Sequence, residues 1–174
     1  MGDDVRERAA FRPDDADLAG HVVFDFDAFD WTEEDEPLFS HPRDPFSRVD
    51  ARRSSRHVRV ERDGVLLAES RTPTLVFETN LYPRFYLPRE DVKAEVLPSD
   101  MVTACPYKGH ATYLSFAAGQ NLAWAYLNPL PDASPLARLV AFFDEVVDVT
   151  VDGVPRQQPD SPLADVMKDE FGVS

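Results

Sequence analysis

The chain of 174 residues has little cysteine, little positive charge and no long apolar run. Cys105 is its one cysteine, so an intramolecular disulfide and a zinc site built from several cysteines are excluded. No apolar run approaches the roughly 20 residues that cross a bilayer. The N-terminal stretch lacks the apolar segment of a secretory signal. We therefore expect a cytoplasmic protein that has no membrane partner.

Basic residues are scarce, since 18 lysines and arginines stand against 32 aspartates and glutamates, for a net charge of −14. Such a field repels phosphate backbones and anionic lipid, so nucleic acid and membrane surfaces are not expected partners. The histidines show no metal-binding spacing, and we expect no metal site and no cofactor. These histidines are His21, His41, His57 and His110.

Hydrophobic residues make up 43% of the chain, which is enough to build a core. The length fits one domain with appended segments. We expect an acidic arm over residues 1–50, with one strand in the alternating run Val22–Trp31. A β domain should follow over residues 51–155, and residues 156–174 should form a C-terminal tail with a short helix.

The middle of the chain carries the densest β pattern. His57–Arg62 alternates apolar and polar residues, as a strand does, and Asp63-Gly64 is a strong hairpin signal. Val65–Ser70 is predicted to form the second strand of this hairpin. Frequent prolines between the later runs favour an antiparallel sheet with tight connections. Further strands are predicted at Leu75–Glu78, Phe85–Leu87, Val92–Leu97, Val102–Cys105, Ala111–Phe116, Leu122–Tyr126 and Val146–Val151.

Helix is signalled near the C-terminus. Ser134-Pro135 supplies an N-cap and a proline at the first helical position, and apolar residues follow at helical spacing to Phe143. The same N-terminal pattern recurs at Ser161-Pro162 and predicts a second helix that ends at Phe171. The fold class is therefore mainly β, with one or two short C-terminal helices.

An arginine cluster lies between residues 48 and 72. In so acidic a protein, its simplest partner is the protein's own acidic arm, and we favour this pairing over an external anion. The cluster consists of Arg48, Arg52, Arg53, Arg56, Arg59, Arg62 and Arg71.

Several motifs, taken together, resemble the DUF427 family over roughly residues 52–155. They are Arg56–Gly64, Glu78-Thr79, Phe85–Asp91, Thr103–Gly109 with its CPYKG stretch, Tyr113, Trp124, Tyr126 with Pro129, and Phe142–Val149. The resemblance implies a compact β-tent or barrel-like fold. Many β-tent domains clamp zinc between cysteine pairs, and this chain departs from that pattern because it has only Cys105.

Ser99–Leu130 is the most informative segment, because Asp100 and Lys108 are its only charges while it is rich in aromatic residues. Such a stretch is typical of a buried wall or a pocket lining. We expect a small-molecule pocket near the CPYKG turn. Its predicted ligand-binding residues are Arg56, Tyr86, Asp91, Tyr107, Tyr113, Trp124 and Tyr126.

Lys108 has three interpretations. It is a solvated turn lysine, or a partly buried cation fixed by Glu78 or Asp91, or a group that clamps an anionic ligand or acts as an amine nucleophile. Cys105 is more often a buried hydrophobe than a nucleophile, although a nearby cation would favour its thiolate. His110 is a possible base.

Three functions remain open from the sequence. The first is a small-molecule-binding domain. The second is an enzyme of small carbonyl or acyl compounds with Lys108, Cys105 and Glu78 as candidate catalytic residues. Either Cys105 or Lys108 acts covalently, or Glu78 and Asp91 act with Tyr86 in acid–base chemistry. The third is an interaction module whose acidic arm docks a basic protein or a second subunit in a homodimer. We rank the binding domain first.

Overall fold

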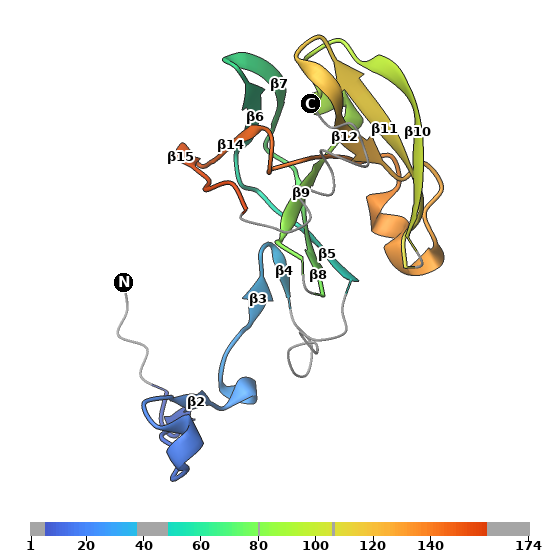
Figure 1. The fold of residues 1–174 in the computed structure, drawn as a ribbon. Coiled ribbons are helices and arrows are strands. Elements are labelled where there is room, and N and C mark those ends of the chain that lie inside the picture. Colours follow the sequence, from blue (N-terminus) through green and yellow to red (C-terminus); the bar gives the residue numbers. More distant parts are fainter. Residues whose placement is uncertain (1–5, 38–48, 80, 106, 160–174) are drawn as a thin grey trace.

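The computed structural model describes residues 6–37, 49–79, 81–105 and 107–159 (Figure 1). Eleven strands build the two sheets of the domain. They are β5 (Val49–Arg53), β6 (Val58–Arg62), β7 (Val65–Ser70), β8 (Thr74–Glu78), β9 (Arg84–Leu87), β10 (Leu97–Cys105), β11 (Gly109–Phe116), β12 (Gly119–Ala125), β13 (Val140–Phe142), β14 (Asp148–Val151) and β15 (Val154–Pro155).

The larger sheet has the strand order β10-β11-β12-β13-β9-β8-β5, and the smaller has β15-β14-β6-β7. Every strand pair is antiparallel, which confirms the predicted sheet type. Neither sheet pairs its last strand with its first, so the described residues form no closed barrel. The barrel-like alternative is therefore wrong, while the mainly β class is confirmed.

Two-residue turns close the hairpins of the smaller sheet. Asp63 and Gly64 join β6 to β7 with φ of +50° and +78°, and Asp152 and Gly153 join β14 to β15 with +51° and +81°. Positive φ at both central residues matches the right-handed twist of the strands, and Asp-Gly tolerates it. Local chemistry thus fixes these two registers.

One core lies between the sheets. The smaller sheet contributes Val58, Val60 and Leu67, and the larger contributes Tyr86 and Phe142 among others, all nearly free of solvent contact. The alternation of buried and less buried residues along β6 and β11 follows from the period of two of a strand.

The predicted strand Val92–Leu97 is wrong over most of its length. Val92 forms one isolated bridge to Ala68, and β10 begins only at Leu97. The amides of Lys93 and Ala94 both donate to the carbonyl of Leu67, at 2.8 and 3.2 Å. Because two successive amides converge on one acceptor, the chain bends here instead of forming a ladder.

The predicted helix from Ser134 to Phe143 is also wrong. A 3-10 turn, η4, covers Pro131–Leu136, and β13 follows. Arg138 adopts φ of +63°, which no helix continues through. Residues Val140 to Phe142 then lie between β12 and β9, so sheet pairing overrides the helical spacing of the apolar residues. The second predicted helix, Ser161–Phe171, lies outside the described residues.

The acidic arm carries β1 (Ala10–Phe11), β2 (Val23–Phe24), β3 (Thr32–Glu33), β4 (Glu36–Pro37) and the 3-10 turns η1 (Ala16–Leu18) and η2 (Phe26–Ala28). The strand predicted at Val22–Trp31 is reduced to β2. The Asp25 carboxylate accepts from the Asp27 amide at 3.2 Å, which caps η2 and ends the extended conformation.

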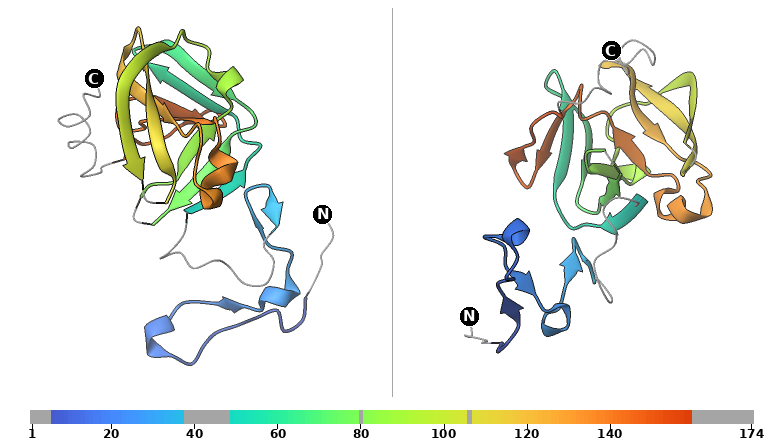
Figure 2. Two further views of the ribbon diagram at one scale, coloured as in Figure 1. Left: turned by 90° about the vertical axis from the view of Figure 1, so that its right-hand side faces the viewer. Right: turned by 60° about the horizontal axis from the view of Figure 1, so that its bottom comes forward.

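In Figure 2 the first part of the arm extends away from the two sheets, and the β3–β4 hairpin points back toward them. Aromatic rings of the arm pack on one another, because Trp31 stacks on Phe26 at 5.4 Å and meets Phe29 edge-on at 5.7 Å. Among the described residues, no helix is long and apolar enough to span a membrane.

Candidate functional site

Lys108 is a buried cation rather than a solvated turn residue. Its side chain is 7% exposed and forms an ion pair with Glu78, whose side chain is 13% exposed. The ammonium nitrogen also lies 5.5 Å from the centroid of the Tyr126 ring, within the range of a cation–π contact. Of the three interpretations of Lys108, the first is wrong, and Glu78 rather than Asp91 is the partner.

The turn before β11 holds Lys108 in this position. The backbone carbonyl of Lys108 accepts a hydrogen bond from the Leu130 amide at 3.0 Å, which joins the turn to the loop after β12. Gly109 has φ of +97°, and a Cβ there would lie 3.5 Å from the Leu130 nitrogen and 3.6 Å from the Asn128 oxygen. The glycine therefore supplies a backbone conformation that other residues avoid, and it turns Lys108 inward.

Aromatic side chains lie beside the Lys108–Glu78 pair, since Lys108 contacts the Tyr126 ring and Tyr86 is close enough to Glu78 to be affected by its charge. The Trp124 indole donates to the hydroxyl of the fully buried Tyr86 at 3.2 Å. Tyr113 stacks on Phe143 at 6.1 Å, and its hydroxyl shares a hydrogen bond with Thr103 at 3.1 Å. Tyr113, Trp124 and Tyr126 of the charge-poor segment are buried, whereas Tyr107 of the same segment is exposed.

Burial keeps the phenols of this group neutral. It raises the pKa of Tyr86, and the negative charge of Glu78 raises it further. It also raises the pKa of Tyr126, with added contributions from Tyr86, Cys105 and Glu78. Both hydroxyls are therefore hydrogen-bond donors at neutral pH, close enough to Glu78 and Cys105 to be affected by their charge.

Seven predicted site residues thus lie in one neighbourhood, which we name the Lys108 centre. Cys105, half-buried at the end of β10, belongs to it. The members are Glu78, Tyr86, Cys105, Lys108, Tyr113, Trp124 and Tyr126.

Four other predicted residues have different surroundings. Arg56 pairs with Glu34 of the arm at 2.9 Å, and Asp91 pairs with Lys93 at 3.7 Å. Tyr107 is 69% exposed. His110 is exposed and lies opposite Ala104 in the β10–β11 ladder.

One member of the arginine cluster, Arg56, pairs with the arm through Glu34. Arg59 instead contacts Glu61 at 2.7 Å and Glu69 at 3.6 Å, both within the smaller sheet. Arg52 pairs with Asp50 of the same strand at 3.0 Å. Arg48 lies outside the described residues.

A buried ion network behind Trp124 was missed by the sequence reasoning. Arg84 lies 5.1 Å from the Trp124 ring and binds Glu145 at 2.7 Å and Asp144 at 3.4 Å. Burial lowers the pKa of Arg84, but the two carboxylates raise it more, so the guanidinium stays charged. Two acids inside the apolar run from Phe142 to Val147 were the signal that a buried cation faces them.

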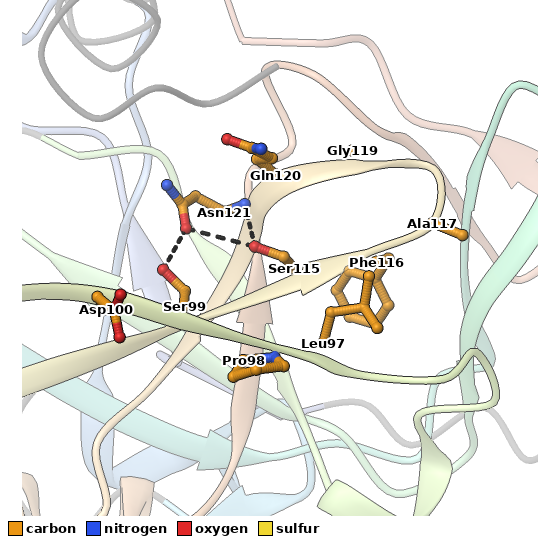
Figure 3. A pocket seen from close by; sticks show the side chains of 10 residues that line it. All are labelled: Leu97, Pro98, Ser99, Asp100, Ser115, Phe116, Ala117, Gly119, Gln120 and Asn121. Carbon is orange, nitrogen blue, oxygen red and sulfur yellow. Dashed lines mark hydrogen bonds between the residues drawn. The ribbon is translucent and has the colours of Figure 1, made fainter.

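Lys108 lines neither of two clefts found on the part of the surface that the structure describes. The first, of about 570 Å³, is drawn in Figure 3. Its polar floor is Asn121, whose side-chain oxygen accepts from Ser99 at 2.6 Å and from Ser115 at 3.5 Å. The full lining is Leu97, Pro98, Ser99, Asp100, Ser115, Phe116, Ala117, Gly119, Gln120 and Asn121.

The second cleft, of about 620 Å³, opens between the two sheets and contains Arg56 and Glu34. Sequence reasoning placed Arg56 with Lys108 in one pocket, and the structure gives Arg56 this separate cleft. Its lining is Glu34, Arg56, Leu75, Phe77, Pro83, Phe85, Val151, Asp152, Val154, Pro155 and Arg156.

The family model described as "Domain of unknown function (DUF427)" matches residues 50–153, well over half of the chain. The chain belongs to the DUF427 family. No match is found among the curated proteins.

The DUF427 region contains every member of the Lys108 centre, while Glu34 and Arg156 of the second cleft lie outside it. Among the described residues, no three histidine, cysteine, aspartate or glutamate side chains gather in a group that could hold a metal ion.

Proposed function

We propose that this DUF427 domain binds a small organic molecule with a negatively charged group, and that the Lys108 centre is its binding site. The observation that carries the proposal is the Lys108 ammonium, 7% exposed and held among aromatic rings beside Glu78. The neutral hydroxyls of Tyr86 and Tyr126 add donors to the same neighbourhood.

The energetic cost of burying two charges favours a functional role for the Lys108–Glu78 ion pair. Taking two charges out of water costs several kcal/mol for each ion, and well-packed apolar residues would often serve stability equally well. A lysine has three donors, and Glu78 is the partner described for one of them, so an incoming anion can share the ammonium. The aromatic wall supplies apolar contact for the rest of the ligand.

Thermal-shift screening of the full chain against a metabolite library tests the proposal. A ligand at about 100 times its Kd adds about 2.7 kcal/mol to native stability. The expected result is a set of anionic compounds that stabilise the wild type and fail to stabilise Lys108→Met. Lys93→Met is the matched control, because Lys93 pairs with Asp91 at the surface, and it should respond as the wild type does.

Two results would overturn the proposal. In one, no compound in the library raises the melting temperature of the wild type. In the other, the compounds that do so raise it equally in Lys108→Met, which would place their binding elsewhere.

A small-molecule enzyme is the second candidate, favoured by the mutual influence of Glu78, Cys105, Tyr86 and Tyr126. An acid, a base and a thiol beside one ammonium are the groups that acyl or carbonyl chemistry uses. Turnover would have to depend on Cys105 or Lys108, and a Cys105→Ser variant that keeps full turnover would remove the thiol mechanism.

A further inference from the structure

The second cleft already holds a carboxylate, and that carboxylate belongs to the arm. Glu34, at the tip of the β3–β4 hairpin, has a side chain only 10% exposed. One of its carboxylate oxygens lies 2.9 Å from a guanidinium nitrogen of Arg56, and the other accepts from the Ser54 hydroxyl at 2.9 Å. Each carboxylate oxygen of Glu34 therefore has its own partner, the charged guanidinium of Arg56 for one and the neutral hydroxyl of Ser54 for the other.

The neighbouring tip residue fixes the hairpin against the domain. The Asp35 amide donates to the Arg53 carbonyl at 3.2 Å, and the Ser55 hydroxyl donates to the Asp35 carboxylate at 3.1 Å. The residues from Arg53 to Arg56 between β5 and β6 therefore receive the tip. In Figure 1 the hairpin stands between the body of the arm and the strands β8 and β9.

The backbone of the tip favours a role for the glutamate side chain. Glu34 is the first of the two turn residues and has φ of +53°, a position where glycine is preferred in a two-residue hairpin. A glutamate is conformationally unfavourable there, and its contacts with Arg56 and Ser54 offset that cost. The side chain is therefore needed for what it binds rather than for the turn.

Most of the remaining lining of the cleft is apolar, although the charged residues Asp152 and Arg156 also belong to it. Leu75, Phe85 and Val151 line it, from β8, β9 and β14. Arg156 closes one side, with its guanidinium 5.8 Å from the Phe85 ring and 3.0 Å from Asp144. Arg156 is thus already paired to the protein, while Arg56, 49% exposed, pairs with the arm.

We infer that this cleft is a binding site for apolar carboxylates, and that the Glu34 tip is a tethered competitor that occupies the carboxylate position. A ligand with a hydrocarbon body would lie on Leu75, Phe85 and Val151, and its carboxylate would replace that of Glu34 on Arg56 and Ser54. This site is separate from the Lys108 centre, and the inference stands or falls independently of the function proposed there.

The tether sets the size of the effect. A tip joined through a short chain has an effective concentration on the order of millimolar, so a weak free ligand is competed out. Removing the charge of the tip should therefore raise the affinity for a free carboxylate at least about fivefold, equivalent to about 1 kcal/mol at room temperature.

Isothermal titration calorimetry of the full chain with octanoate tests the inference. Glu34→Gln should bind octanoate at least about fivefold more tightly than the wild type. Asp30→Asn is the matched control, because it removes the same charge from a fully exposed arm residue, and its affinity should equal that of the wild type. Adding Arg56→Met or Ser54→Ala to Glu34→Gln should weaken binding again.

Octan-1-ol, with the same hydrocarbon body and no charge, should bind Glu34→Gln more weakly than octanoate does. The inference is overturned if Glu34→Gln gains no affinity, if Asp30→Asn gains as much, or if octanol binds as tightly as octanoate. Loss of Lys108 should leave octanoate binding unchanged, which separates this result from the test of the Lys108 centre.

Discussion

Replacing Lys108 by methionine isolates the energy of the buried ion pair. The substitution keeps most of the unbranched side chain, which becomes one atom shorter, and removes the ammonium. The charge of Glu78, whose side chain is 13% exposed in the wild type, is then left unpaired. Breaking a buried pair in this way costs about 3–5 kcal/mol, and the residual exposure of Glu78 places the expected loss near 3 kcal/mol. Loss of the contact with the Tyr126 ring adds about 1 kcal/mol.

Equilibrium unfolding in urea measures this loss. For a domain near 100 residues, each kcal/mol corresponds to about 4 °C in Tm, so Lys108→Met should melt more than about 10 °C below the wild type. Adding Glu78→Gln removes the stranded charge. The double variant should therefore be no less stable than Lys108→Met, and the coupling energy of the cycle should exceed about 1.5 kcal/mol.

Lys93→Met supplies the surface comparison. Lys93 and Asp91 are 45% and 24% exposed, and pairs of this kind contribute about 0–1 kcal/mol. A loss of less than about 1 kcal/mol in Lys108→Met, equal to that of Lys93→Met, would refute the reasoning, because the ammonium would then be solvated. A coupling energy near zero would show that Glu78 is not its partner.

Further predictions concern the tyrosines, Cys105 and a turn glycine. Burial raises the pKa of Tyr86, Tyr113 and Tyr126 above the value of about 10 that a tyrosine has in an unfolded chain. The native state is therefore fully stabilised below about pH 10, and this stability is lost as the pH rises toward the higher pKa values of the folded state. Phenolate absorbance from these three should appear together with the loss of circular dichroism, and their ionisation in a fully folded protein would contradict the burial. Half-buried Cys105 should react with iodoacetamide at least about tenfold more slowly in the folded chain than in urea; a faster reaction when folded would instead indicate an activated thiolate and favour the enzyme. Gly153→Ala should cost about 1 kcal/mol in urea unfolding, because φ is +81° and no atom lies within 4 Å of the new Cβ. Gly153→Asn should cost less, and an equal loss would argue against a backbone origin.

Local chemistry explains why some elements were predictable. Asp63-Gly64 and Asp152-Gly153 can adopt positive φ at low cost, so each defines its hairpin without help from distant residues. The strand Val65–Ser70 was predicted with its exact bounds for this reason. The scarcity of charge around Lys108 predicted burial because unpaired charges are costly in a core. This holds for Tyr113, Trp124 and Tyr126, while Tyr107 and Leu127 of the same segment are exposed.

The failure at Ser134–Phe143 has the opposite origin. Its cap and apolar spacing suit a helix, yet Val140–Phe142 lies between β12 and β9. Each residue there gains sheet hydrogen bonds and full burial, which together outweigh helix preferences of a few tenths of a kcal/mol per residue. The local sequence pattern of this segment cannot indicate that it will pair with β12 and β9, because those strands are distant along the chain.

The sequence alone determined the β class and the tight hairpins, because these depend on neighbours along the chain. Only the tertiary structure decided which charges meet. Glu78 and Lys108 are thirty positions apart, and Arg56 meets Glu34 of the arm rather than the Lys108 centre. An ion pair depends on the distance between its charges through space, and the tertiary fold sets that distance where sequence separation does not.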